Sequence, residues 1–329
     1  MKRIAVTGCS GYYGSRLIQY ISTVSPQTRI LGLDLRLPGP TKVDEFAQID
    51  LRSPDLHSRL ADFQPDTIIH LAFIVKSIHD ERLMEEVNLA GSRNLLSAAS
   101  KIRPQRLLAA SSATALGAWP ENPVPMDDYH PPRALPTYLY ARHKAILETL
   151  LADFTSEHPE IAVSWTRPCV VCGPHIDNYL SRMYLDQIAV VRPDGCDVPQ
   201  QFVHEDDLAA ATWHILKQGG RGPYNVGPAD WMLLSDIARE TGRRSVSLPL
   251  SVMYAALKIC WALRLPFLDY PPASAQFTRY PWVVAPNRLC KELGFQFRYS
   301  SLEAFRAMVQ AHVQRRTGAS QPPKDRQVA

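Results

Sequence analysis

The stretch Thr7-Gly8-Cys9-Ser10-Gly11-Tyr12-Tyr13-Gly14 lies between a short apolar run, Ile4-Ala5-Val6, and a segment predicted to be helical, residues 15–22. Three glycines at this spacing let a strand turn sharply into a helix beneath a pyrophosphate. The first glycine permits the turn, the second lets the backbone approach the phosphates, and the third packs helix against strand. The helix N-terminus adds N–H groups and a positive dipole end. The stretch therefore predicts a dinucleotide site, with an ordinary turn as the alternative.

Length, charge and cysteine use limit the class of protein. The chain has 329 residues, 46% of them hydrophobic, and a formal net charge of +4 with both signs spread along it. This predicts one large or two modest domains and argues against a dedicated nucleic-acid or membrane-surface binder. The pair Cys169 and Cys172 lies in an apolar run with no partner pair at metal-ligand spacing, which favours buried structural cysteines and no metal site. We expect a reduced, cytoplasmic protein without a signal peptide.

Strand-like and helix-like segments alternate along the first half of the chain. Such alternation predicts a parallel sheet with helices on both faces, a Rossmann-type doubly wound α/β fold whose ligands bind beyond the carboxyl ends of the strands. The expected strands are residues 4–7, 30–34, 47–50, 67–72, 107–111 and 162–167, and the longer expected helices are residues 81–101 and 137–156.

The later part of the chain has a different composition. Residues 1–173, with an interleaved segment near 202–228, are expected to form the NAD(P)-binding Rossmann domain. Residues 174–317 are expected to form mainly a smaller C-terminal substrate-binding cap, and residues 318–329 a disordered tail. The apolar stretch 252–263 is too short to span a bilayer. We interpret it as a buried or pocket-lining helix, with peripheral membrane contact as the alternative.

An acidic residue follows the glycine-rich stretch at the expected distance. Asp34 ends the second strand, 20 residues after Gly14. A carboxylate there accepts hydrogen bonds from the adenosine ribose hydroxyls and repels a 2′-phosphate, which favours NAD over NADP. Arg36 leaves NADP open, because its guanidinium can bind a phosphate.

Two further strand ends are expected beside the cofactor. Asp50 and Leu51 end the third strand and are predicted to contact the adenine, with a helix cap as the alternative for Asp50. Leu71 and Ala72 end the fourth strand, so their backbone is predicted to pass beneath the dinucleotide.

A tyrosine and a lysine four residues apart, Tyr140 and Lys144, share one face of the long predicted helix. A tyrosine with its ordinary pKa of about 10 is a poor base near neutrality, and a lysine ammonium beside it favours the phenolate. Ser112 closes the fifth strand, where its hydroxyl could hold a substrate oxygen, or merely cap the strand end.

These residues together resemble the extended short-chain dehydrogenase/reductase family, also called the NAD-dependent epimerase/dehydratase family. The resemblance covers residues 1–312 in the right order. Its further matching segments are Asn88-Leu89-Ala90-Gly91-Ser92-Arg93-Asn94-Leu95-Leu96, Arg167-Pro168-Cys169-Val170-Val171-Cys172-Gly173-Pro174, Phe202-Val203-His204-Glu205-Asp206-Asp207-Leu208-Ala209, Tyr224-Asn225-Val226-Gly227, Glu292-Leu293-Gly294-Phe295 and Ser301-Leu302-Glu303.

The resemblance implies a role for each matching position, with NAD as cofactor and NADP as the alternative. Tyr140 is the implied acid/base, Lys144 lowers its pKa and binds the nicotinamide ribose, and Ser112 orients the substrate oxygen. The backbone of Tyr12 and Tyr13 meets the pyrophosphate. Asn88 belongs to a structural water network and is counted with the cofactor-binding residues. Family members often dimerise through the two long helices, so we expect a homodimer.

Two departures from the family pattern bear on the substrate. Dehydratases of the family have Thr-Asp-Glu where this chain has Ser112-Ala113-Thr114, so water elimination is not expected. Nucleotide-sugar epimerases have an arginine for the diphosphate where this chain has Gln200, although Arg182, Arg192 or Arg279 could replace it. The cap aromatics are interpreted as cap core, with an apolar substrate pocket as the alternative.

We therefore predict an NAD(P)-dependent oxidoreductase that transfers a hydride between the nicotinamide and a small-molecule secondary alcohol or ketone. A nucleotide-sugar 4-epimerase with permanently bound NAD is the alternative. A non-catalytic dinucleotide-binding scaffold is a third possibility.

Overall fold

The computed structural model describes residues 1–39, 41–265 and 270–317, except for the side chains at 179 and 180. The predicted tail, residues 318–329, lies outside the described residues.

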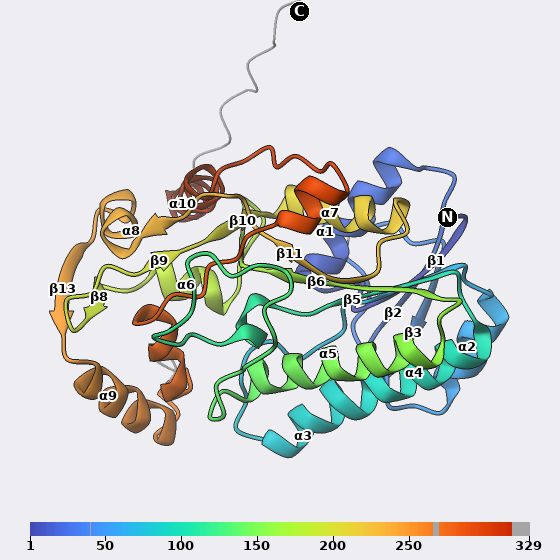
Figure 1. The fold of residues 1–329 in the computed structure, drawn as a ribbon, viewed down its shortest axis with the longest axis horizontal. Helices are drawn as coiled ribbons and strands as arrows, with labels where there is room; N and C mark the ends of the chain where they lie inside the picture. Colours follow the sequence, from blue (N-terminus) through green and yellow to red (C-terminus); the bar gives the residue numbers. More distant parts are fainter. Residues whose placement is uncertain (40, 266–269, 318–329) are drawn as a thin grey trace, which may run out of the picture.

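A seven-stranded parallel sheet forms the centre of the molecule (Figure 1). Its order is β11-β6-β5-β4-β1-β2-β3, and every pairing within it is parallel. This confirms the predicted Rossmann-type fold. The strands are β1 (Arg3–Thr7), β2 (Arg29–Asp34), β3 (Glu45–Gln48), β4 (Thr67–His70), β5 (Arg106–Ala110), β6 (Ala162–Pro168) and β11 (Gly222–Val226).

Helices cover both faces of the sheet, each over its own apolar layer. On one face the packed helices are α2 (Asp55–Phe63), α4 (Gly91–Ile102) and α5 (Leu139–Glu157); on the other they are α1 (Tyr12–Val24) and α7 (Glu205–Lys217). Leucines of α2, α4 and α5 pack beneath the sheet, whereas Leu17 and Ile18 of α1 meet α7 above it. Because both faces are covered, the inner strands β1, β4 and β5 are buried along nearly their whole length instead of alternating.

The predicted helix 81–101 is interrupted. It consists of α3 (Glu81–Glu85), a π-helical turn η1 (Glu86–Ala90) and α4. Asn88 lies in the π turn and is fully buried. The wider turn is of a kind found mostly within α-helices and often at functional sites.

A smaller cap lies beyond one end of the sheet (Figure 1). It contains three short strand pairs, β10 with β7, β12 with β9, and β13 with β8. Its elements, with the linking turns, are η2 (Ala113–Leu116), β7 (Val170–Cys172), α6 (Tyr179–Leu185), β8 (Ala189–Pro193), β9 (Pro199–Gln200), β10 (Phe202–His204), β12 (Met232–Leu233), α8 (Leu234–Thr241), β13 (Arg244–Leu248), α9 (Leu250–Ala262), η3 (Pro272–Thr278), η4 (Arg288–Glu292) and α10 (Ser301–Thr317). Among the described residues, no helix has the length and apolar character needed to cross a bilayer.

The chain returns to the sheet after it has entered the cap. Residues 202–226 form β10, α7 and then β11, which pairs with β6 at the edge of the sheet, Asn225 opposite Arg167. The domain boundaries predicted at residues 173 and 317 stay a prediction.

The helix predicted over 252–263 is present as α9, but the prediction that it is buried or lines a pocket is wrong. Leu257 is its one buried residue, whereas Val252, Ile259 and the following Leu263 are exposed. Apolar composition indicated burial, yet α9 lies at the outer end of the cap, where it packs on one side against η3 (Figure 1).

Candidate active site at the carboxyl edge of the sheet

The glycine-rich loop after β1 is tightly packed at two of its three glycines. Gly8 has a φ of +71°, and a Cβ there would lie 2.6 Å from the backbone nitrogen of Ala72. A Cβ on Gly14 would lie 2.2 Å from the Gly8 carbonyl oxygen, whereas one on Gly11 would meet only that oxygen, at 3.2 Å. The loop thus needs Gly8 and Gly14 for its own shape. Gly11 leaves space above the loop, as a pyrophosphate cradle requires.

The helix that follows this loop begins without a side-chain cap. Gly11 is its N-cap residue and has extended backbone, and Tyr12 and Tyr13 are the first helical residues. The first N–H groups of a helix have no intrahelical partner, so they favour an anion at this end. The backbone of Tyr12 and Tyr13 is therefore in the position that the predicted pyrophosphate contact needs.

The Asp34 carboxylate lies beside the glycine-rich loop, at the end of β2. One oxygen accepts a hydrogen bond from the Ser10 N–H at 3.0 Å and the other from the Arg36 N–H at 3.0 Å. The Ser10 hydroxyl also donates to the Arg36 carbonyl at 2.6 Å. These contacts fix Asp34 where a ribose is expected, with the Arg36 backbone next to it.

The prediction that Asp50 ends a strand is wrong, as is its alternative as a helix cap. β3 ends at Gln48, and α2 begins after Pro54. The Asp50 carboxylate is instead paired with Arg52, Nη2 to Oδ2 2.7 Å, and this hydrogen bonding lowers the pKa of Asp50. The guanidinium of Arg52, two residues away, therefore occupies the carboxylate oxygens of Asp50. The adenine contact of Asp50 stays a prediction, with Arg52 now competing for the same oxygens.

The other predicted backbone positions are held by buried polar contacts. β4 ends at His70 and not at Ala72, but the N–H groups of Leu71 and Ala72 both lie 3.2 Å from the Thr7 hydroxyl. Burial lowers the pKa of His70 to about 3, so the ring is neutral. Leu51 is buried, and its carbonyl accepts from the Asn94 amide at 2.7 Å.

Asn88 anchors the loop that follows β4. Its Oδ1 accepts from the Ile74 N–H at 2.7 Å, and its Nδ2 lies 3.1 Å from the Ile74 carbonyl and 3.3 Å from His143 Nδ1. The side chain therefore joins the π turn, this loop and α5. Its place in a water network beside the cofactor stays a prediction.

Tyr140 and Lys144 are both buried on the inner face of α5. The Lys144 ammonium donates to the Ala110 carbonyl at 2.5 Å and lies 3.5 Å from the centroid of the Phe73 ring. It is 5.8 Å from the centroid of the Tyr140 ring. The structure thus brings together the tyrosine and lysine that the sequence predicted, at the carboxyl end of β5.

Burial controls the protonation of this pair. It raises the pKa of Tyr140 to about 12, against a lowering by a hydrogen bond with Ser112. It lowers the pKa of Lys144 to about 7, against a raising by the Glu148 carboxylate. Burial therefore outweighs the hydrogen bond with Ser112, and in the protein without its cofactor the pKa of Tyr140 lies above its ordinary value. The role of Lys144 in lowering that pKa stays a prediction.

Ser112 caps the turn that follows β5, as one of its two predicted roles requires, and it also lies beside Tyr140. Its role in orienting a substrate oxygen stays a prediction. Its hydroxyl accepts from the Thr114 N–H at 3.2 Å and from the Thr114 hydroxyl at 2.9 Å, which caps the short helix η2. The same hydroxyl contacts Tyr140. Thr114 was not singled out from the sequence, although it follows Ser112 by two residues.

A pocket opens beside these residues, between the sheet and the cap. The empty space in it, open mouth included, is about 640 Å³. Apolar atoms form most of its wall, and Lys76 is the charged residue among its described lining. The residues that line it include Thr114, Tyr138, Val170, Met183, Tyr184, Gln200, Phe277 and Trp282.

Gln200 lines the pocket, but its side-chain amide is bound to the backbone of the cap. It is fully buried, and its amide donates to the Phe277 carbonyl at 2.9 Å. Arg279 is paired with Asp194 at 2.8 Å, and Arg182 lies 3.5 Å from Asp177. Neither of these arginines, nor Arg192, is among the described lining residues.

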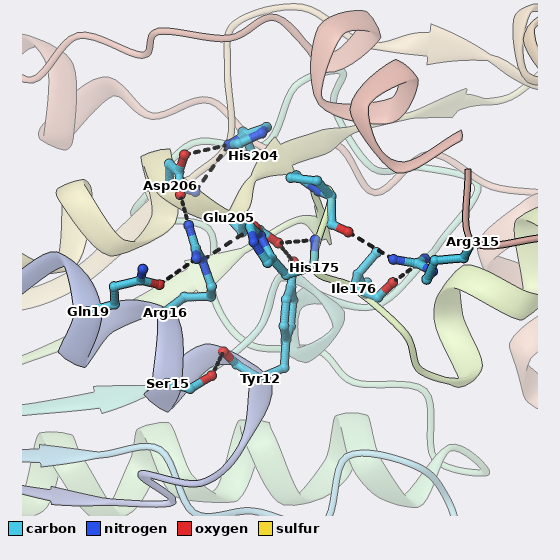
Figure 2. A network of polar contacts seen from close by, with 11 residues as sticks. Tyr12, Ser15, Arg16, Gln19, His175, Ile176, His204, Glu205, Asp206 and Arg315 are labelled. Atoms are coloured by element: carbon cyan, nitrogen blue, oxygen red, sulfur yellow. Dashed lines mark hydrogen bonds and ion pairs between the residues drawn. The ribbon is translucent and has the colours of Figure 1, made fainter. Parts of the chain in front are cut away.

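A buried carboxylate connects the glycine-rich loop with the cap (Figure 2). Glu205, at the start of α7, accepts from the Tyr12 hydroxyl and from His175 Nδ1, and its Oε1 lies 3.3 Å from Arg16 Nε. Burial and the Glu205 charge both raise the pKa of Tyr12, so the phenol stays protonated. Arg16 also pairs with Asp206 at 2.5 Å.

The sequence held one signal for this network that was not used. Glu205 follows Phe202-Val203-His204 where the family element has valine. An acid in place of a valine at a buried position implies a polar partner. The partner, Tyr12, is 193 residues away in the chain, so it could not be named from the sequence.

Comparison with known proteins agrees with this geometry. The family model described as "NAD dependent epimerase/dehydratase family" matches residues 4–227. The chain belongs to this family. The match confirms the predicted family and an NAD-dependent enzyme of the extended short-chain dehydrogenase/reductase superfamily, with NAD as its cofactor.

Individual relatives within and around the family are distant. An uncharacterised protein of Mycobacterium tuberculosis (strain ATCC 25618 / H37Rv) is 25% identical over 312 residues, 92% of this chain and 82% of the relative. A sterol-4-alpha-carboxylate 3-dehydrogenase, decarboxylating, of Candida albicans is 26% identical over 195 residues, 53% of this chain and 52% of that enzyme. The structure of UDP-glucose 4-epimerase of Thermus thermophilus in complex with NAD superposes with a TM-score of 0.73 at 23% identity, covering 94% of this chain and 98% of that one.

Proposed function

We propose that this member of the NAD-dependent epimerase/dehydratase family is a dehydrogenase or reductase for a secondary alcohol or ketone on an apolar, diphosphate-free small molecule. The observation that supports this most directly is the pocket wall. A nucleotide diphosphate needs cationic or several amide partners. The described lining beside Thr114 is mostly apolar, and Gln200, at the position of the epimerases' arginine, donates its amide to the cap backbone.

In this proposal each site residue has a separate role in proton transfer or in binding. NAD supplies, when bound, the nicotinamide that accepts or returns the hydride. Tyr140 accepts the proton of the substrate hydroxyl in oxidation when it is the phenolate, and as the phenol it donates that proton in reduction. Ser112 holds the substrate oxygen by its hydroxyl, while Lys144 supplies positive charge beneath the tyrosine when it is protonated. Gly8, Gly11 and Gly14 with Asp34 hold the dinucleotide.

Nucleotide-sugar 4-epimerase remains the second candidate. It is supported by the fold shared with the Thermus thermophilus epimerase, at 23% identity. The similarity to a sterol-4-alpha-carboxylate 3-dehydrogenase, over about half of each chain, supports the first proposal instead, since the substrate in that enzyme's name is a sterol carboxylate without a nucleotide diphosphate. The scaffold alternative is disfavoured because Tyr140 and Lys144 are both buried in the site.

Cofactor exchange distinguishes the two enzymes. Freshly purified protein is denatured and the supernatant is assayed for NAD and NADP by mass spectrometry, and the intact protein is then assayed for NAD-linked oxidation of a panel of apolar secondary alcohols. An empty site that exchanges NAD and turns over such alcohols supports the dehydrogenase. Near-stoichiometric retained NAD together with interconversion of UDP- or dTDP-sugars would establish the epimerase. Tyr140→Phe should lower kcat about 10²- to 10⁴-fold with little change in NAD affinity in either case.

A further inference from the structure

Helix α9 is apolar on all sides, yet most of its residues are exposed or half-buried, and Trp261 is stacked on His79. In its sequence, Leu250-Ser251-Val252-Met253-Tyr254-Ala255-Ala256-Leu257-Lys258-Ile259-Cys260-Trp261-Ala262, the one charged residue is Lys258. Leu257 is buried, whereas Val252 is 51% exposed, Ile259 59% and the adjoining Leu263 65%. A helix that is hydrophobic all round is normally enclosed by protein or lipid. Exposed apolar residues gathered on one helix point to a binding surface.

The strand before α9 also carries exposed apolar residues. β13 is exposed along its whole length, Val246 and Leu248 included, and Ile188, just before its partner β8, is exposed as well. Figure 1 shows α9, β8 and β13 together at the outer end of the cap, away from the sheet. We call Ile188, Val246, Leu248, Val252, Ile259 and Leu263 the apolar end of the cap.

The charges of this segment all have one sign. Residues 241–268 contain four basic residues, Arg243, Arg244, Lys258 and Arg264, and no Asp or Glu; the acids Glu240, which pairs with Arg306, and Asp269 flank the segment. Arg244, Lys258 and Arg264 are exposed. The carboxylate at the start of α9, Asp194, is paired with Arg279 and accepts from the Leu250 N–H at 2.9 Å. Basic residues beside exposed apolar ones complement an anionic, apolar partner.

The length of α9 limits what that partner can be. Its 13 residues are too few to cross a bilayer, which takes about 20, but they suit a helix that lies in the plane of the lipid headgroups. A second copy of the chain is a poorer occupant. A two-fold contact through this end would bring like basic charges face to face.

We propose that the apolar end of the cap docks on the surface of an anionic lipid bilayer, with α9 lying in the interface. The apolar residues enter the boundary between headgroups and acyl chains. Arg244, Lys258 and Arg264 meet the anionic headgroups. Docking goes beyond the proposed function and does not depend on turnover.

The position of α9 connects this surface with the pocket. α9 packs against η3, and Ser274 and Phe277 of η3 line the pocket. If the proposed function holds, docking brings the pocket wall close to the lipid, where an apolar alcohol is concentrated. This consequence rests on the proposed function, whereas the docking itself is tested without substrate.

Vesicle flotation tests the docking directly. The full chain is mixed at physiological ionic strength with vesicles of phosphatidylcholine and phosphatidylglycerol in equal amounts, and separately with phosphatidylcholine alone. We expect the protein to float with the anionic vesicles and less with the neutral ones. Lys258→Gln with Arg264→Gln should lower the partition coefficient about 25-fold, roughly fivefold for each charge. Lys101→Gln with Lys217→Gln, two exposed cations elsewhere, should leave it unchanged.

A matched pair of apolar substitutions separates docking from general surface effects. Val252 on α9 and Val313 on α10 are each 51% exposed. We expect Val252→Glu to lose flotation more than tenfold and Val313→Glu to keep it. Thermal unfolding midpoints close to wild type show that both variants fold.

Three outcomes would overturn the proposal. The first is wild-type protein that stays at the bottom of the gradient with anionic vesicles. The second is equal flotation of the Val252 and Val313 variants. The third is absence of flotation together with self-association, in sedimentation velocity, that Val252→Glu abolishes, which would make this end an interface between copies. Because none of these measurements uses turnover, a failure of docking leaves the proposed enzyme activity untouched, and the reverse also holds.

Discussion

Lys144 and Glu148 lie one helical turn apart on the buried face of α5, and the carboxylate raises the pKa of the ammonium against the effect of burial. Glu148 is itself held by Arg167, Nη2 to Oε2 2.6 Å, and by the Ser111 hydroxyl at 2.5 Å. Tyr140 precedes Lys144 by one turn. A tyrosine, a lysine and a glutamate thus form one buried stripe beside β5 and β6. Such a stripe costs stability, and the cost can be measured.

Lys144→Met should abolish turnover and stabilise the fold at neutral pH. The pKa of Lys144 falls from 10.5 to about 7 on burial, which corresponds to about 5 kcal/mol against folding. Leaving the Ala110 carbonyl unpaired returns about 1–3 kcal/mol of that. The expected gain, about 2–4 kcal/mol, is measured by urea unfolding.

The pH dependence of that gain has a fixed sign. Below about pH 7 the lysine is protonated in both folded and unfolded chains, so the full cost is present. Between about 7 and 10.5 the unfolded chain binds more protons, so wild-type stability rises with pH and the advantage of methionine shrinks. Lys101→Met on the exposed face of α4 is the control and should change little. A methionine variant less stable than wild type at neutral pH would contradict the buried-charge cost.

Glu205→Gln should destabilise the protein and weaken NAD binding, because Glu205 joins α1 to α7 through Tyr12 and Arg16 (Figure 2). Removing one partner of a buried ion pair costs about 3–5 kcal/mol. Tyr12 begins the helix whose N-terminus faces the proposed pyrophosphate, so its displacement should raise the Kd for NAD. Thermal unfolding and NAD titration by calorimetry measure both effects.

The neighbouring Asp206 supplies a matched control for Glu205. It also binds Arg16, but its side chain is 38% exposed against 1% for Glu205. Asp206→Asn should therefore cost no more than about 1 kcal/mol and leave the NAD affinity near wild type. Equal losses from the two substitutions would show that burial of Glu205 is not what matters.

Gly11→Ala should keep the fold and lose the cofactor. Its added Cβ would meet only the Gly8 carbonyl oxygen, at 3.2 Å, and would occupy the space above the loop. Gly8→Ala should instead impair folding, since its Cβ would lie 2.6 Å from the Ala72 nitrogen at a φ of +71°. The measurement is thermal unfolding with and without NAD. Stabilisation of the Gly11 variant by NAD to the wild-type extent would refute the cradle.

Asp34→Ser should relax the choice of dinucleotide. A carboxylate at the ribose repels a 2′-phosphate, so its removal should improve kcat/KM for NADP about tenfold or more relative to NAD. Arg36→Ala in the Asp34→Ser background should reverse that gain while leaving NAD use unchanged. Initial rates with both dinucleotides test this, and an unaltered ratio would place the ribose elsewhere.

The parts of the fold that were predictable rest on local spacing. The glycine-rich loop, the strand–helix alternation and the pair Tyr140–Lys144 each depend on residues within a few turns of one another. A glycine by itself allows the turn of the loop, and a spacing of four residues by itself places Tyr140 and Lys144 on the same face of a helix. These features are confirmed as structure, whereas the roles of the site residues stay predictions.

The predictions that were wrong or missing depend on competing interaction partners or on contacts between segments far apart in the sequence. Asp50 is held by Arg52, a partner that the strand pattern did not weigh. α9 has the composition of a core helix, but composition reports a preference for burial and not which surface supplies it. The π turn around Asn88 and the Tyr12–Glu205 contact arise only once distant segments are packed.

The return of β11 to the edge of the sheet has a consequence for how the chain is made. β6 acquires its outer neighbour only from Gly222–Val226, after the chain has built α6, β8 and α7. On the ribosome, the last parallel ladder cannot close until these residues have left the exit tunnel. The nascent sheet therefore waits, with β6 as an open edge, for about 50 residues of synthesis. At ordinary translation rates this takes several seconds, during which the unpaired edge of β6 is open to binding by a chaperone.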